Sequence, residues 1–163
     1  MTAAPLAIEA LAALLPAKAR LIGVDLGTKT IGLALSDVER RVASPLVTLA
    51  RTAFARDAEA LSAQARKFEA FALIVGMPFE MTGAEGPRAQ ATRAFTRNFA
   101  ARDAIPIAFW DERFSTAAVD RALIANDVSR ARRAAVVDKM AAAYILQGAL
   151  DRLAGIAAKR PSQ

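Results

Sequence analysis

The sequence predicts an α/β domain in which a mixed, five-stranded sheet is flanked by helices. Three short apolar runs follow one another before any helical pattern begins, which is typical of strands joined in hairpin order. Beyond them, helical and strand patterns alternate along the chain. The chain has 163 residues, 55% of them hydrophobic, which is enough for one domain with a substantial core.

The first three predicted strands form an antiparallel start to the sheet. Residues 21–24 are a continuous apolar run, as expected of a strand that is buried on both faces. Gly27 supplies the backbone freedom that a tight turn needs, and the apolar pattern resumes over residues 31–35. Residues 42–49 predict a third strand, in which Pro45 indicates a sheet edge or a bulge.

The rest of the chain alternates between helices and strands. Apolar residues at helical spacing predict a helix over residues 54–69, and residues 71–75 predict a short buried strand. Pro87 suits the first position of a helix that runs to about Arg102. A strand is predicted over residues 105–110. It is followed by a helix that Ser115 or Thr116 can cap and that ends at about Asn126. The last and longest helix is capped by Ser129 and ends at about Leu153.

The two ends of the chain differ from this middle part. Residues 1–19 predict an N-terminal extension with a short helix, residues 20–155 the domain, and residues 156–163 a flexible tail. A signal peptide is not expected, because Glu9 interrupts the apolar residues near the N-terminus and no basic stretch precedes them. No segment approaches the roughly 20 apolar residues that span a bilayer. The sequence therefore predicts a cytoplasmic protein without a membrane partner.

Composition excludes several kinds of chemistry. The chain contains neither cysteine nor histidine, which excludes disulfides, thiolate nucleophiles, Ser-His-Asp hydrolysis and zinc held by histidine. Hydrolysis would then depend on carboxylates, and carboxylates alone suit the hard cations Mg²⁺ and Mn²⁺. The 22 Lys and Arg against 16 Asp and Glu give a net charge of +6, which favours polyanionic partners.

Three carboxylates are candidates for one site. Asp25 ends the first predicted strand and Glu112 follows the last one, and both therefore lie at the edge where open α/β sheets bind ligands. Asp138 sits on the last helix in a stripe of small apolar residues, which is the face that should pack against the sheet. Two of them have a plainer interpretation: Asp25 could merely cap a turn, and Asp138 could lie at the margin of its stripe. Asp111 could take the place of Glu112 or support it as a neighbour.

Such a set predicts a particular chemistry. Three convergent carboxylates can hold two divalent ions, which activate a water molecule and stabilise the leaving oxygen in phosphodiester hydrolysis. The sequence therefore favours a metal-dependent nuclease.

Basic residues lie where phosphates would approach such a site. Arg130, Arg132 and Arg133 crowd the first turn of the last helix, where the helix dipole disfavours cations. Lys29 follows the Asp25 turn, and Arg113 adjoins Glu112. Further candidates on the middle helix are Arg88, Arg93 and Arg97. These residues predict affinity for nucleic acid without sequence preference, although a solvated charged face is the alternative for any one of them.

Four motifs together resemble a known family. They are VDLGTKTIG at 24–32, IVGMP at 74–78, DERFST at 111–116 and VDKMAA at 137–142. In this order and spacing they resemble the YqgF family, also called RuvX or Holliday-junction-resolvase-like, the proposed pre-16S rRNA nucleases of bacteria. The resemblance covers about residues 20–153. One departure lies at 80–84, where relatives usually carry Asn followed by Met-Asp-Gly-Thr and this chain has EMTGA.

The resemblance implies an RNase H-like fold and a cytoplasmic, metal-dependent nuclease. It implies Asp25, Glu112 and Asp138 as the acidic catalytic and metal-binding residues, and precursor rRNA of the small ribosomal subunit as the partner. The altered loop leaves the metal residues in place but removes possible substrate contacts. Loop 77–86 is itself either a mobile flap over the site or an ordinary connection.

Other functions remain open from the sequence alone. A resolvase of four-way DNA junctions would share the fold and the chemistry but would act as a homodimer, whereas a monomer suffices for trimming RNA. A non-catalytic RNA-binding protein of ribosome assembly is a further alternative. The turn at Asp25-Leu26-Gly27-Thr28 also resembles a phosphate-binding turn of actin-like ATPases, but those enzymes need two such lobes.

Overall fold

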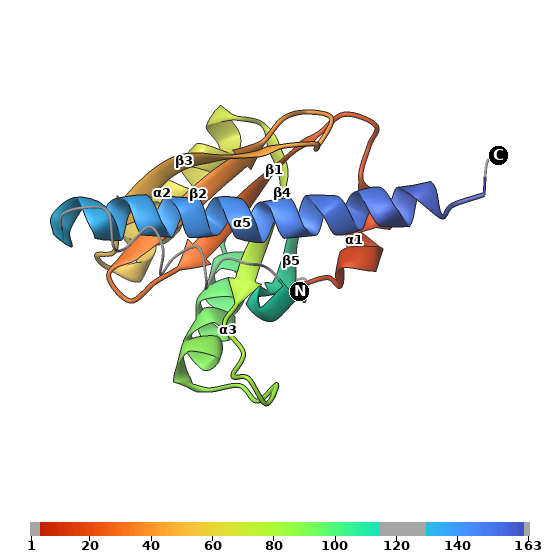
Figure 1. The fold of residues 1–163 in the computed structure, drawn as a ribbon. Coiled ribbons are helices and arrows are strands. Elements are labelled where there is room, and N and C mark those ends of the chain that lie inside the picture. The colour runs from red at the N-terminus through yellow and green to blue at the C-terminus, as the bar shows by residue number, and fades with distance from the viewer. Residues whose placement is uncertain (1–3, 115–129, 162–163) are drawn as a thin grey trace.

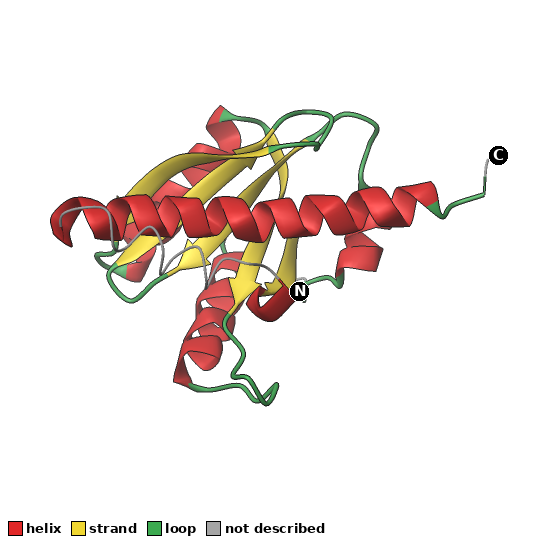
Figure 2. Ribbon diagram, in the orientation of Figure 1, coloured by secondary structure: helices red, strands yellow, loops and turns green. Residues whose placement is uncertain are grey.

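The structure is a computed structural model that describes residues 4–114 and 130–161, with only the backbone described over 130–137. Its five strands lie in the order β3-β2-β1-β4-β5. The elements are α1 (Ile8–Leu14), β1 (Arg20–Leu26), β2 (Thr30–Ser36), β3 (Ala43–Ala50), α2 (Phe54–Lys67), β4 (Ala70–Met77), α3 (Pro87–Ala100), β5 (Ile107–Asp111), the 3-10 turn η1 (Glu112–Phe114) and α5 (Arg130–Ala158). The predicted mixed, five-stranded sheet flanked by helices is confirmed (Figure 2).

The central strand β1 joins the two halves of the sheet. It pairs antiparallel with β2 and parallel with β4. β2 continues antiparallel to β3, and β4 continues parallel to β5. The expectation for Pro45 is confirmed in both respects, because β3 is an edge strand and its register with β2 shifts between Leu33 and Ala34.

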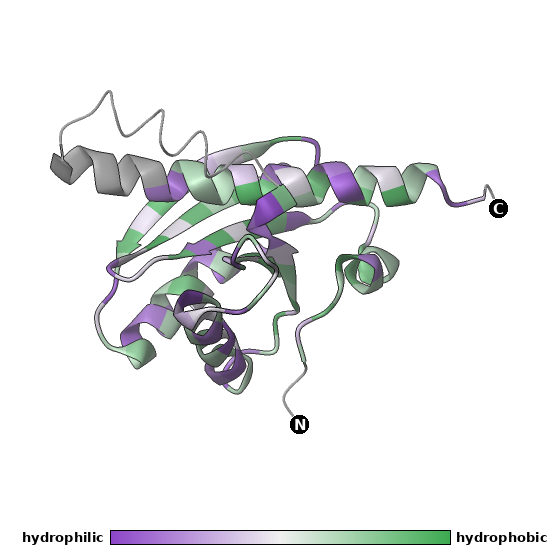
Figure 3. Cartoon of the chain, turned by 60° about the horizontal axis from the view of Figure 1, so that its bottom comes forward, coloured by the Kyte–Doolittle hydropathy of each residue, from purple (hydrophilic) through white to green (hydrophobic). Residues whose placement is uncertain are grey.

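Helices cover the two faces of the sheet and create two cores. The long helix α5 crosses one face (Figure 1). There its buried residues join those of β1, β2, β4 and α1 in one cluster. The other face packs against α2 and α3, whose apolar sides supply Leu61, Phe95 and Phe99. Hydrophobic residues colour the strands, and hydrophilic residues recur along α3, as expected for a sheet buried on both faces (Figure 3).

The N-terminal residues pack on the sheet and on α5. Leu6 donates its backbone N–H to the carbonyl of Ile107 at 2.7 Å, forming a parallel bridge beside β5. Leu11 of α1 is fully buried in the α5 core. A hydrogen bond of 3.1 Å from Arg152 to Glu9 ties the outer side of α1 to α5. The short helix expected before Pro16 is confirmed.

The last helix is longer than predicted. It continues past Leu153 to Ala158, because Ile156 still packs against the core and outweighs the poor helix propensity of Gly155. The helix expected from Ser115 or Thr116 to Asn126, and the cap expected at Ser129, lie outside the described residues. No helix in the described ranges has the length and apolarity needed to cross a membrane.

Gly155 offers a simple test of this helix end. An added Cβ at Gly155 meets no atom within 4 Å, so alanine fits without strain. Gly155→Ala is expected to raise the free energy of unfolding by about 0.5–1 kcal/mol, because alanine loses less backbone entropy in a helix. Urea denaturation monitored by circular dichroism measures the change. An unchanged or lower stability would place the end of the helix before residue 155.

Candidate functional site

Asp25 lies on the face of the sheet that α5 covers. Alternate residues of β1 face opposite sides: Ile22 and Val24 join the α2–α3 core, whereas Leu21 joins the α5 core. Asp25 shares the side of Leu21 and is only 2% exposed. A carboxylate buried this deeply is costly unless polar or cationic groups compensate it. Its burial makes Asp25 a candidate for the functional site.

Two glycines flank Asp25 on the neighbouring strands. Gly32 of β2 is its partner in the antiparallel register, and Gly76 of β4 follows Val75, the partner of Val24. A Cβ at Gly32 would overlap the backbone carbonyl of Asp138, and a Cβ at Gly76 would lie 2.7 Å from the Glu112 carboxylate oxygen Oε1. The two glycines therefore let the other two acidic residues approach the sheet on either side of Asp25.

Asp138 is held between α5 and the start of β2. Its neighbours one turn further along, Ala141 and Ala142, are buried, so the predicted small-residue stripe does face the sheet. Asp138 itself is half-buried, and its carboxylate oxygen Oδ2 accepts a short hydrogen bond from the hydroxyl of Thr30. The side chain thus points to the β1–β2 hairpin that carries Asp25.

Glu112 reaches the same face from the end of β5. β5 ends at Asp111, and Glu112 opens the 3-10 turn η1. Its carboxylate lies over Gly76, as described above. Within the described residues, however, no three acidic side chains form a complete metal-binding group. The structure therefore places Asp25, Glu112 and Asp138 on one face around two glycines, without closing them on a single point.

Asp111 forms an ion pair with Arg113. The carboxylate accepts hydrogen bonds from the backbone N–H and from Nε of Arg113, both at 3.0 Å, and from the guanidinium nitrogen Nη2 at 2.6 Å. Partial burial raises the pKa of Asp111, but the hydrogen bonds and the charge of Arg113 outweigh it and hold that pKa below its ordinary value. Asp111 thus orients Arg113, beside Glu112.

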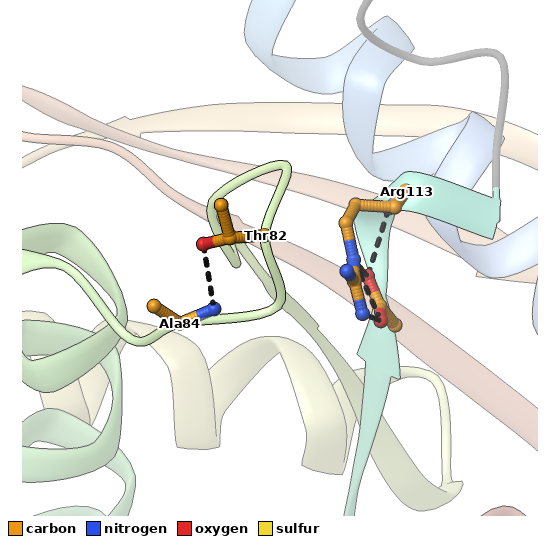
Figure 4. A network of polar contacts seen from close by, with 4 residues as sticks. Thr82, Ala84 and Arg113 are labelled. Atoms are coloured by element: carbon orange, nitrogen blue, oxygen red, sulfur yellow. Dashed lines mark hydrogen bonds and ion pairs between the residues drawn. The ribbon is translucent and has the colours of Figure 1, made fainter.

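The loop before α3 packs against this ion pair. Gly83 has a φ of +87° and lies next to the guanidinium of Arg113, which also lies over the ring of Phe79 at 5.6 Å. Figure 4 shows this loop, with Ala84, beside the side chain of Arg113. The loop closes on itself through a hydrogen bond of 2.9 Å from the Glu80 N–H to the Ala84 carbonyl. The loop therefore forms a hydrogen-bonded turn beside Arg113, with Met81 92% exposed.

The lowered pKa of Asp111 predicts a pH-dependent stability. A carboxyl whose pKa is lower in the folded than in the unfolded protein stabilises the fold above its ordinary pKa of 3.8, and this stabilisation is lost as the pH falls through the folded value. Asp111→Asn is expected to cost at most about 1 kcal/mol at pH 7, since the pair is partly exposed. Urea denaturation from pH 7 to pH 3 should show that the difference in unfolding free energy between the unchanged protein and Asp111→Asn shrinks below about pH 4. A difference that stays constant over this range would contradict the stabilising role of the Asp111 charge.

The other residues predicted to contact phosphates lie on three elements: the turn between β1 and β2, helix α3 and the start of α5. Lys29 is exposed in the turn between β1 and β2. Arg130, Arg132 and Arg133 begin α5, but their side chains lie outside the described part of the chain. On α3, Arg93 pairs with Glu85 through a contact of 2.5 Å from Nη2 to Oε1 and lies over the ring of Phe109 at 5.2 Å. The exposed residues Arg88 and Arg97 share this helix.

Sequence reasoning missed Thr30, Gly32 and Gly76. Each of them contacts or adjoins an acidic residue on another strand or helix, and such a contact becomes visible only once the pairing of the elements is known. The available signal was the glycine inside each apolar strand pattern, since such a glycine often marks a close approach of another backbone.

The order and directions of the five strands, with helices on both faces, define an RNase H-like fold. The chain resembles Thermus thermophilus RuvC with a TM-score of 0.53 and 15% identity, covering 83% of this chain and 96% of that one. It resembles the same protein in complex with a Holliday junction substrate with a TM-score of 0.52 and 15% identity, over 85% and 97% of the two chains. At this identity the likeness concerns the fold, and it confirms the fold class expected from the sequence.

The chain belongs to the RuvX family. The family model, described as "Holliday junction resolvase", matches residues 19–152. A protein of Methylocella silvestris is 60% identical over 158 residues, which cover 97% of this chain and 98% of that protein. A protein of Beijerinckia indica is 62% identical over 143 residues, with 88% and 87% covered. Both carry the name "Putative pre-16S rRNA nuclease". The family resemblance of the four motifs is confirmed.

Proposed function

We propose that this chain is a metal-dependent nuclease that hydrolyses phosphodiester bonds of structured RNA and trims the 5′ end of pre-16S rRNA. The observation that carries the proposal is the burial of Asp25 between Gly32 and Gly76, which admit Asp138 and Glu112 to the same face of the sheet. Supporting it are the RuvX family membership and the shared name of the 57–62% identical relatives.

The donor set suits a hard divalent cation. All three candidate ligands are carboxylates, and the chain has no histidine or cysteine that would favour a softer metal. The glycines on either side of Asp25 let the backbone of Asp138 and the carboxylate of Glu112 come close to the sheet. Asp25, Glu112 and Asp138 would hold one or two Mg²⁺ or Mn²⁺ ions. Such ions supply an activated water molecule and stabilise the leaving oxygen of a phosphodiester.

Basic residues of the β1–β2 turn, of α3 and beside Glu112 bind and orient the RNA. Lys29 and the exposed arginines of α3 attract the phosphate backbone, which gives affinity without reading the bases. Arg113, oriented by Asp111, presents its charge next to Glu112. The net charge of +6 assists the encounter with a polyanion. We place this activity in the cytoplasm, on the precursor of the small ribosomal subunit, where either a monomer or a homodimer could trim the RNA.

A second candidate is the resolution of four-way DNA junctions. It is favoured by the description of the family model and by the fold shared with RuvC. Cutting both strands symmetrically requires two active sites, and therefore a homodimer.

One comparison tests the proposal against this alternative. End-labelled precursor rRNA carrying the 16S 5′ region and a labelled four-way DNA junction are incubated with equal amounts of protein and with Mg²⁺, Mn²⁺ or EDTA. The proposal expects metal-dependent cleavage of the RNA. Symmetric cleavage of the junction alone would favour a resolvase, and binding without cleavage of either substrate would favour a non-catalytic assembly role.

A further inference from the structure

The hydrogen bond between Thr30 and Asp138 joins two parts of the chain that are 108 residues apart. The hydroxyl of Thr30 donates to Oδ2 of Asp138, and both side chains are half-buried. Such a charge-assisted bond is stronger than one between neutral groups. Its partners come from the first residue of β2 and from the N-terminal third of α5.

Thr30 is fixed in place by the hairpin. Its carbonyl accepts a hydrogen bond of 2.9 Å from the N–H of Gly27, and Ile31 after it pairs with Leu26. As a β-branched residue in a strand, Thr30 has restricted χ1 freedom. The hairpin therefore presents the hydroxyl in a defined direction.

The backbone of Asp138 is fixed from the other side. Its carbonyl lies against Gly32, which follows Thr30 by two residues and so faces the same side of the sheet. Gly32 is also the register partner of Asp25. Residues 30–32 of β2 thus contact both the backbone and the carboxylate of Asp138, and they pair with the strand that carries Asp25.

We propose that Thr30 is a positioning residue that orients Asp138 for binding a divalent ion. By holding Oδ2, Thr30 would restrict the rotation of the carboxylate and leave Oδ1 available to a metal ion. Hydrogen-bonded carboxylates are typical of metal sites, and removal of the supporting partner typically weakens metal binding about 10- to 100-fold. The inference rests on the proposed function, because it assigns Asp138 to the metal site.

The test measures Mn²⁺ binding to the metal-free full-length protein by electron paramagnetic resonance, without substrate. Thr30→Val keeps the shape and removes the hydroxyl, Thr30→Ser restores a hydroxyl, and Thr28→Val removes an exposed hydroxyl from the same turn. We expect Thr30→Val to weaken Mn²⁺ binding about tenfold or more, and Thr30→Ser and Thr28→Val to bind nearly as the unchanged protein does. Thermal unfolding verifies that each variant folds.

The outcomes separate the inference from the proposed function. If the unchanged protein binds Mn²⁺, Asp25→Asn abolishes the binding and Thr30→Val leaves it unaltered, only the role of Thr30 is overturned. If Thr30→Val and Thr30→Ser weaken binding equally, the effect is one of packing and the inference is overturned as well. If the unchanged protein binds no Mn²⁺ and cleaves no RNA, both the proposed function and the role of Thr30 are overturned.

Discussion

Asp25→Asn is expected to lower the rate of metal-dependent RNA cleavage by about a thousandfold or more, which corresponds to about 4 kcal/mol of transition-state stabilisation. Asp25 is buried at the centre of the sheet edge, between the glycines that admit Glu112 and Asp138. An amide of nearly the same size keeps the packing but removes the negative charge that a divalent ion needs. The loss should therefore appear in cleavage and in Mn²⁺ binding, with little change in the fold.

The matched control is Asp151→Asn. Asp151 is exposed on α5, where it accepts a hydrogen bond of 2.9 Å from Gln147. This variant loses the same charge from the chain, so it reports any general effect of net charge on RNA binding. Single-turnover cleavage of labelled precursor rRNA compares the two. Equal rates for Asp25→Asn and the unchanged protein would remove Asp25 from the catalytic site.

Gly32→Ala is expected to damage both stability and cleavage. The added Cβ would overlap the backbone carbonyl of Asp138, and neither backbone can yield as a flexible side chain would. Helix α5 would have to move away from β2, taking Asp138 with it. Such overpacking typically costs about 1–3 kcal/mol. We expect a loss of that size in urea denaturation, and cleavage reduced well below the fraction of protein that remains folded.

Gly155→Ala serves as the control for this substitution. It adds the same methyl group to a glycine near the end of α5, where the space is open. Cleavage should be unchanged in that variant. If Gly32→Ala retained full stability and activity, the close approach of α5 to β2 at Asp138 would be wrong.

The sequence was sufficient to predict the strand ends that carry Asp25 and Glu112. Apolar runs mark buried strands, and each acidic residue follows such a run, so their shared edge follows from the order of elements alone. The small residues Ala141 and Ala142 likewise predicted which side of the last helix faces the sheet. These features depend on local patterns, which a single sequence carries.

Contacts between distant segments were not predictable in the same way. Thr30 meets Asp138 across 108 residues, and the hydroxyl of a threonine at a strand start has many other possible partners. The pairing of Asp111 with Arg113 depends on the 3-10 turn that follows β5, which apolar periodicity does not reveal. The end of α5 depends on Ile156 packing against the core, where tertiary contact overrides the propensity of Gly155.

We propose that Asp25, Glu112 and Asp138 together hold a divalent ion. Crystals of the unchanged protein soaked in Mn²⁺ test it most directly, through the anomalous difference map collected at the manganese absorption edge. We expect an anomalous peak at ligating distance from Asp25 and Glu112, with Asp138 contributing to the same site. Bound Mn²⁺ that is remote from Asp25, or no peak at an Mn²⁺ concentration that supports cleavage, would contradict it.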